Sequence, residues 1–95
     1  MKKGYVYILT NPKNTVLYIG VTSNLVKRIW QHKNKTIDGF SKKYNLTKII
    51  YFEIFESIEE AILREKRMKK WKRNWKENLI NQTNPNWNDL YKEII

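Results

Sequence analysis

A chain of 95 residues is long enough for one domain with a single modest core, so we expect residues 1–95 to form one domain. It carries 19 Lys and Arg against nine Asp and Glu, a net charge of +10, with one histidine and no cysteine. Disulfides and thiolate metal sites are thereby excluded, and no apolar run approaches the ~20 residues that span a bilayer. We therefore expect a cytoplasmic protein without a membrane partner. The charge favours nucleic acid as the polyanionic partner, although basic composition alone is equally typical of plain solubility.

The first predicted element is a β-hairpin. Residues 5–10 (YVYILT) and 15–19 (TVLYI) are β-branched and aromatic, and residues 11–14 (NPKN) have the chemistry of a turn. A four-residue loop would pair Thr10 with Thr15 and set two tyrosines, Tyr7 and Tyr18, opposite each other on one face. The hairpin alone favours interpreting them as packed cross-strand aromatics.

A helix is predicted next, from residue 25 to about residue 33. The segment 22–24 (TSN) offers an N-cap, and an apolar stripe follows it. Arg28 and His32 are four residues apart and project from the same side of this helix. Such a pair is usually a solvated face, so it indicates no function by itself.

The second half of the chain predicts a strand and a long helix. Residues 34–46 are interpreted as a loop with at most one helical turn, and residues 48–55 (KIIYFEIF) as a third strand, expected to be central and most buried. Ser57 and Glu60 fit a capping box that opens one long helix, with apolar positions continuing to Ile80 at helical spacing.

Glu65 interrupts the apolar stripe of the long helix. A carboxylate aimed at a core needs a metal or an ion-pair partner, and the periodicity alone favours a buried salt bridge. Between Arg64 and Lys76 there are eight Lys or Arg and one acid, which predicts a positive outward face suited to phosphates. The candidate nucleic-acid-binding cations are Lys27, Lys33, Lys66, Lys69, Lys70 and Arg73.

Taken in order, these signals resemble the motifs of the GIY-YIG nuclease family, especially its short, single-domain bacterial members of the UPF0213-like type. Tyr5-Val6-Tyr7 stands at the first motif, Tyr18-Ile19-Gly20 matches the second, and Leu63-Arg64-Glu65-Lys66 resembles the metal-binding segment. Arg28 and His32 occupy the family's helix positions. The first motif departs from the family in having Tyr5 immediately before its central residue, where a glycine is expected.

The resemblance implies an α+β fold: a three-stranded antiparallel sheet flanked by helices, with a long basic C-terminal helix. It implies a structure-selective endonuclease of DNA repair or recombination that hydrolyses phosphodiester bonds with Mg²⁺ or Mn²⁺ held by Glu65. A family asparagine corresponds to Asn84 or Asn88, of which Asn84 is favoured. The implied catalytic residues are Tyr7, Tyr18, Arg28, His32, Glu65 and Asn84.

The nucleic-acid partner implied is DNA in preference to RNA. We expect no separate recognition domain within these 95 residues, so specificity would come from substrate shape or from a protein partner. Two alternatives stay open. One is a nucleic-acid-binding module that retains the fold without turnover, and the other is a basic scaffold for acidic proteins. Neither of them requires Glu65 beside two phenols, an arginine and a histidine.

Overall fold

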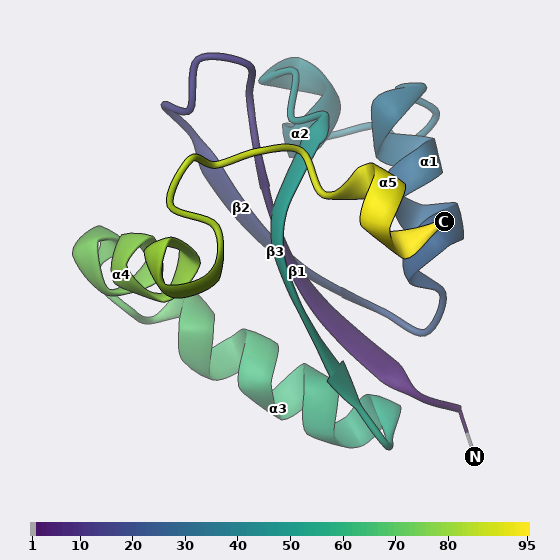
Figure 1. The fold of residues 1–95 in the computed structure, drawn as a ribbon. Coiled ribbons are helices and arrows are strands. Elements are labelled where there is room, and N and C mark those ends of the chain that lie inside the picture. Colours follow the sequence, from purple (N-terminus) through teal and green to yellow (C-terminus); the bar gives the residue numbers. More distant parts are fainter. Residues whose placement is uncertain (1) are drawn as a thin grey trace.

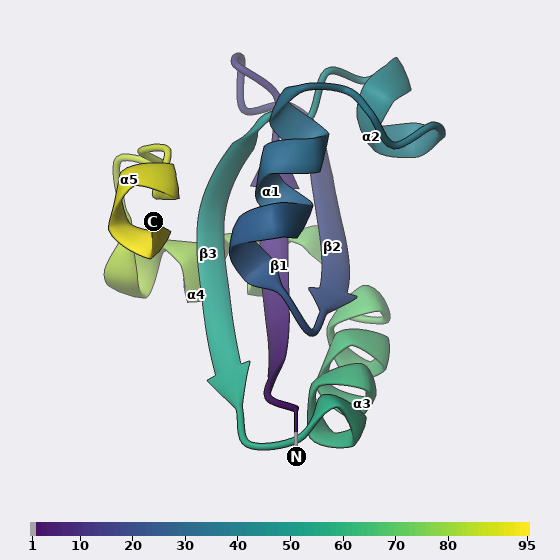
Figure 2. The ribbon, with the colours of Figure 1, turned by 90° about the vertical axis from the view of Figure 1, so that its right-hand side faces the viewer.

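The computed structural model describes residues 2–95 and has an α+β architecture, with helices on both faces of a three-stranded antiparallel sheet (Figures 1 and 2). Helices α1 and α5 cover one face, and α3 and α4 cover the other. No helix within residues 2–95 has the length and apolar character to cross a membrane. The elements are β1 (Gly4–Thr10), β2 (Leu17–Thr22), α1 (Leu25–Lys33), α2 (Phe40–Lys43), β3 (Lys48–Phe55), α3 (Ile58–Lys69), α4 (Arg73–Thr83) and α5 (Tyr91–Ile94).

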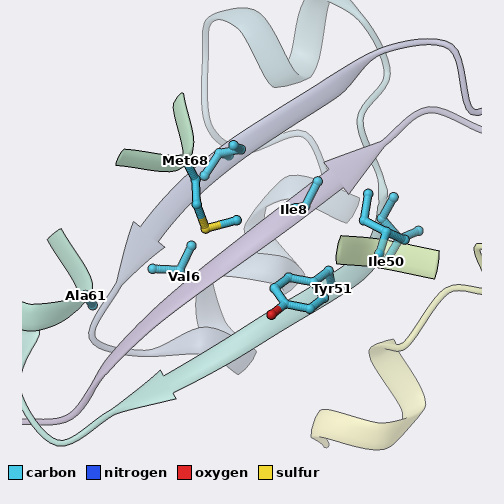
Figure 3. Close-up of a cluster of buried hydrophobic side chains, with 8 residues drawn as sticks. Val6, Ile8, Ile50, Tyr51, Ala61 and Met68 are labelled. Carbon is cyan, nitrogen blue, oxygen red and sulfur yellow. The ribbon is translucent and has the colours of Figure 1, made fainter. Parts of the chain in front are cut away.

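Strand β1 is the centre of the sheet, whose strand order is β2-β1-β3. Its side chains alternate between two cores: Val6 and Ile8 point towards α3 and α4, whereas Tyr7 and Leu9 point towards α1 and α5. Figure 3 shows Val6 and Ile8 packed with Ala61 and Met68 of α3. The prediction that residues 48–55 form the central strand is wrong. An apolar run can also occur at a sheet edge when helices cover both of its faces, as they do here.

The hairpin has a longer loop and a different register from those predicted. Thr10 pairs with Leu17 rather than Thr15, so the loop spans residues 11–16. The side chain of Asn11 organises this loop, because its Oδ1 accepts hydrogen bonds from the backbone N–H groups of Thr15 (2.8 Å) and Val16 (3.1 Å).

This register shift amounts to two residues, which is one full period of a strand. Tyr7 therefore lies opposite Gly20, and Tyr18 lies opposite Leu9, instead of the two tyrosines facing each other directly. Because side chains alternate with a period of two, both phenols still point to the same face. The predicted shared face is confirmed, although the predicted pairing is wrong.

The long C-terminal helix predicted from Ser57 onwards is two helices. Helix α3 ends at Lys69, and Lys72 has an extended backbone that serves as the N-cap of α4. A straight helix from residue 58 to residue 80 would be ~35 Å long, whereas an eight-residue strand such as β3 spans ~27 Å. The bend at residues 70–72 lets both Met68 and Ile80 reach the same core.

Helix α3 is held against the sheet by an ion pair with β3 and by a close backbone contact with β1. Arg64 donates two hydrogen bonds to the carboxylate of Glu53 on β3, at 2.9 and 3.0 Å, and Tyr51 donates a third. At the other end, Gly4 of β1 approaches the backbone of α3 so closely that a Cβ would lie 2.8 Å from the Cα of Ile58. These contacts fix the position of the helix that carries Glu65.

The C-terminal segment is held by Asn84, the buried C-cap of α4. Its Nδ2 donates to the backbone oxygens of Ile50 (3.0 Å) and Asn88 (2.9 Å), and its Oδ1 accepts from the N–H of Asn88 (3.0 Å). The following segment then bonds to β3 through Leu90 N–H and Ile49 O, at 2.8 Å. Asn84 thus ties α4, β3 and the approach to α5 together.

We predict that Asn84→Ala lowers the free energy of unfolding by about 2–4 kcal/mol, because buried backbone groups lose their partners and each costs about 1–3 kcal/mol. Urea denaturation measures the change. Asn88→Ala is the matched control, since Asn88 joins the network through its backbone, and it should change stability by less than about 1 kcal/mol. Equal losses in the two variants would contradict the anchoring role.

Candidate active site

Two tyrosines and the chain's single histidine converge on one face of the sheet. Figure 2 shows that α1 covers this face. Tyr7 on β1 and His32 on α1 are buried, and Tyr18 on β2 is half-buried. The ring centroids lie 6.4 Å apart for Tyr7 and Tyr18, 5.7 Å for Tyr7 and His32, and 6.0 Å for Tyr18 and His32. The three rings therefore form one cluster drawn from three elements.

Gly20 makes room for this cluster. Tyr7 lies opposite Gly20 in the register, and its phenol crosses the glycine so closely that a Cβ there would sit 2.3 Å from Cζ and 2.4 Å from the hydroxyl oxygen. No side chain can occupy that volume while the phenol keeps its position. The glycine is therefore required by packing, and it lets the Tyr7 hydroxyl extend towards the β2 edge.

His32 is held from both sides of its ring. Its Nε2 lies 3.0 Å from the Tyr7 hydroxyl, and its Nδ1 lies 2.9 Å from Oγ of Ser41, a buried residue of α2. A hydroxyl can donate or accept, so Ser41 can support either neutral tautomer of the imidazole. The sequence analysis did not identify Ser41. A lone serine in a polar loop carries no periodic signal, and only the fold places it beside the histidine.

Burial determines the protonation of Tyr7 and His32. Desolvation, and then the neighbouring Tyr18, raise the pKa of Tyr7 well above its ordinary value, although Arg28 opposes this. Desolvation, and then the charge of Arg28, lower the pKa of His32 to about 4. In the free protein the charge of Arg28 does not offset the desolvation of this phenol. At neutral pH the site holds a protonated phenol and a neutral imidazole.

Arg28 sits one turn before His32 on α1. The helix starts as soon as β2 ends because Asn24 caps it, its Oδ1 accepting a hydrogen bond from Lys27 N–H at 3.2 Å. The charge of Arg28 lowers the pKa values of both Tyr7 and His32, so its guanidinium shares their surroundings. Arg28 also lines an open pocket of about 200 Å³, together with Thr22, Ser23, Asn24, Lys27 and Gln31.

Glu65 approaches from α3, which packs on the opposite face of the sheet and extends beyond the β2 edge (Figure 2). Its side chain is 13% exposed and forms an ion pair with Lys69 at 3.1 Å. Its negative charge contributes to raising the pKa of Tyr7, which places the carboxylate in the electrostatic surroundings of the phenol. Glu65 is thus close to buried, as the periodicity predicted, with a partner that is itself 52% exposed.

The fit of a divalent metal rests on Glu65. Within residues 2–95 no three His, Cys, Asp or Glu side chains gather into a ligand cluster. A lone carboxylate at the edge of an open site suits Mg²⁺ or Mn²⁺, since Mg²⁺ retains several waters and is commonly bound through one or two carboxylates plus phosphate oxygens. The donor chemistry therefore fits such an ion, and Glu65 is the residue that would hold it.

The predicted nucleic-acid-binding cations fall into two groups. Lys27, Lys66 and Lys70 have exposed side chains. The other three have partners within the protein: Lys33 binds Asp89 and the backbone oxygen of Thr47, Lys69 pairs with Glu65, and Arg73 pairs with Glu77 and reaches the hairpin oxygens of Thr15 and Asn14. The predicted positive face between Arg64 and Lys76 is divided between two helices, α3 and α4, and Lys27 and Lys33 belong to α1.

The structure does not bring Asn84 together with the other predicted site residues. Its amide is fully engaged at the β3 edge, with Ile50 and Asn88. The ring cluster instead lies over β1 and β2. Asn84 therefore supports the fold, and five of the six predicted catalytic residues share one neighbourhood: Tyr7, Tyr18, Arg28, His32 and Glu65.

Comparisons with known proteins identify the family of this domain. Residues 3–78 match the GIY-YIG catalytic domain. A UPF0213 protein from Clostridium perfringens (strain 13 / Type A) is 41% identical over 90 residues, covering 95% of this chain and 96% of that protein. Another, from Syntrophus aciditrophicus (strain SB), is 36% identical over 83 residues, covering 86% and 94%.

A solved structure is similar as well. The solution NMR structure of a UPF0213 protein from Bacillus halodurans superimposes with a TM-score of 0.58 at 26% identity, and the alignment covers 95% of both chains. The region matched by the family runs from the start of β1 into α4, and so contains the tyrosines, the arginine, the histidine and Glu65. The chain therefore belongs to the GIY-YIG catalytic-domain family and is of the UPF0213 type.

Proposed function

We propose that the protein is a structure-selective endonuclease that uses a divalent metal to hydrolyse phosphodiester bonds in nucleic acid. Family membership supports a nuclease and a nucleic-acid substrate. The observation that carries the proposal is the convergence of Tyr7, Tyr18, His32, Arg28 and Glu65 from four elements at the β2 edge. A fold kept only for binding has no need of a carboxylate beside these groups.

Each side chain has a role that follows from its chemistry. Arg28 borders the open pocket and would neutralise charge that develops on the phosphoryl oxygens. The hydroxyls of Tyr7 and Tyr18 would position the attacking water and a non-bridging oxygen. His32 is neutral at pH 7 and would orient Tyr7 through their hydrogen bond. Its lowered pKa makes the imidazole a weak base and leaves almost no imidazolium at neutral pH to act as a general acid in the free protein.

Glu65 would hold the metal, in keeping with the general use of divalent metals by nucleases of this family. When bound, Mg²⁺ or Mn²⁺ supplies Lewis-acid polarisation of the phosphoryl group and stabilises the leaving oxygen. DNA is the favoured substrate, and a role in repair or recombination is consistent with a nuclease that reads shape. The exposed cations Lys27, Lys66 and Lys70 would contribute charge-dependent affinity rather than base recognition.

One observation favours the alternative of a non-catalytic binding module. The carboxylate that a metal requires is paired with Lys69, so metal binding has to displace that ammonium. Because Lys69 is 52% exposed, the pair is worth no more than about 1 kcal/mol and can be exchanged readily. Substitution of the Glu65 carboxylate distinguishes a nuclease from a non-catalytic binding module.

Glu65→Gln should reduce metal-dependent cleavage at least ~100-fold while the protein stays folded, because the amide keeps the shape of the side chain and loses the metal-binding charge. Labelled DNA incubated with Mg²⁺ or Mn²⁺ measures the rate, and thermal melting reports folding. Glu60→Gln, an exposed position on the same helix, is the control and should retain the parental rate. Full metal-stimulated cleavage by a folded Glu65→Gln protein would contradict the role of Glu65 in holding the metal.

Tyr7→Phe, Tyr18→Phe and Arg28→Ala should each lower the cleavage rate by at least ~100-fold, as expected when a positioning or charge-stabilising group is lost. Phenylalanine keeps the ring and its packing, so single-turnover rates distinguish hydroxyl chemistry from core packing. Tyr51→Phe is a control phenol on the other face of the sheet. Rates near the parental value in both Tyr7→Phe and Tyr18→Phe would show that the two tyrosines have a structural role only.

The lowered pKa of His32 predicts a dependence of stability on pH. Below about pH 6.5 the unfolded chain protonates His32, whereas the folded protein does so only near pH 4, so the unfolded state binds more protons within this window. The free energy of unfolding should therefore fall by about 3 kcal/mol as the pH drops from 6.5 to 4. His32→Gln should lack this component. Parallel pH profiles of the two proteins in urea denaturation would contradict a buried neutral histidine.

A further inference from the structure

A row of three aromatic rings extends from the candidate active site to the surface. The rings of Tyr18 and Phe40 are stacked, with centroids 6.0 Å apart and planes 25° apart, and those of Phe40 and Tyr44 lie 4.6 Å apart. Phe40 is 47% exposed and Tyr44 is 41% exposed. We call Tyr18, Phe40 and Tyr44 the aromatic row. It begins at a phenol of the ring cluster and ends in solvent.

The position of α2 explains why these rings face outwards. This single helical turn lies beside the start of β2 (Figure 2), and its inward residue Ser41 is buried against His32. Phe40 precedes Ser41, and Tyr44 follows Phe40 by four residues, so the two rings share one side of the turn. The backbone oxygen of Ser41 also accepts a hydrogen bond from Leu46 N–H at 2.9 Å, and Leu46 is fully buried. The row therefore stands on an anchored segment.

Positive charge accompanies the aromatic row. The ammonium of Lys43 lies 5.5 Å from the ring centroid of Tyr44, and Lys35 and Lys42 are exposed nearby in the chain. Asp38, which pairs with Lys42, is the one acid between residues 34 and 46. Exposed ring faces interleaved with cations are the combination that binds single-stranded nucleic acid: bases stack on the rings and phosphates meet the cations.

We infer that the aromatic row is a stacking platform for unpaired bases of the strand that enters the active site. The choice of nucleic acid as the ligand rests on the proposed function, and the choice of unpaired bases rests on the row itself. Bases within a duplex already stack on their neighbours and present no free face to Phe40 or Tyr44. The substrate class is therefore single-stranded nucleic acid, or an unpaired flap or end, next to the scissile phosphate.

Binding in EDTA tests the platform without any cleavage. Fluorescence anisotropy with a short labelled oligo(dT) and with an abasic strand of equal length separates base stacking from phosphate attraction, since both strands carry the same backbone charge. The protein should bind oligo(dT) more tightly, and Phe40→Ala and Tyr44→Ala should each weaken that binding roughly 5- to 150-fold, the loss of one stacked base. Neither substitution should weaken binding of the abasic strand.

Matched variants complete the test. Phe40→Trp restores a ring face and should bind oligo(dT) at least as well as the parent protein. Trp75→Ala removes a ring of similar exposure, 54%, from α4 on the other face of the sheet, and should leave the preference for oligo(dT) intact. Circular dichroism checks that each variant is folded. If one substitution disturbs α2, the variant at the other position still tests the platform.

The outcomes separate this inference from the proposed nuclease. Equal affinity for oligo(dT) and the abasic strand, or a folded Phe40→Ala and Tyr44→Ala pair that binds like the parent, would overturn the platform even if the protein cleaves DNA. A preference for oligo(dT) that depends on Phe40, in a protein that cleaves nothing with Mg²⁺ or Mn²⁺, would support the platform and contradict the nuclease. Cleavage of a flap in preference to a blunt duplex, lost in Phe40→Ala, would support both.

Discussion

The close approach of Tyr7 to Gly20 is the contact on which the candidate site depends. A phenol from the central strand can cross to the edge strand only where its partner has no side chain, and the register places Gly20 directly opposite. The hydroxyl then reaches His32 from one side and the surroundings of Glu65 from the other. Groups from both faces of the sheet can meet at this edge because Gly20 has no side chain there.

Burial gives this meeting point its chemical character. A hydroxyl and an imidazole removed from water both favour their neutral forms, so Tyr7 keeps its proton and His32 does not take one up at neutral pH. Arg28 and Glu65 bring opposite charges to the site from different helices, and Lys69 pairs with Glu65. A phosphodiester brings negative charge, and a divalent ion brings positive charge, into a region whose own polar groups are pre-arranged rather than solvated.

Much of this arrangement is predictable from the sequence because short-range rules govern it. The period of two puts Tyr7 and Tyr18 on one face whichever loop joins the strands, and the period of 3.6 turns Glu65 inwards. What could not be predicted depends on long-range packing. The strand order depends on which strands pair over long range, because helices cover both faces of β3 as well as of β1. The bend at residues 70–72 depends on the size of the sheet. The position of Ser41 beside His32 and the exposure of Phe40 depend on how residues 34–46, which have no periodic pattern, pack against α1.

Helix α2 and its C-cap residue Tyr44 contact both the candidate active site and the solvent. Ser41 holds the imidazole of His32 from within, and Phe40 and Tyr44 face solvent from the same turn. A shift of this turn would move both sets of contacts together, so the orientation of His32 and the occupancy of the aromatic row are thermodynamically linked. Such linkage is reciprocal. If the oriented imidazole strengthens the binding of a nucleic-acid strand by a certain free energy, then binding of that strand stabilises the oriented imidazole by the same free energy. Binding of substrate at the aromatic row would then favour the oriented form of His32 through this single turn of helix.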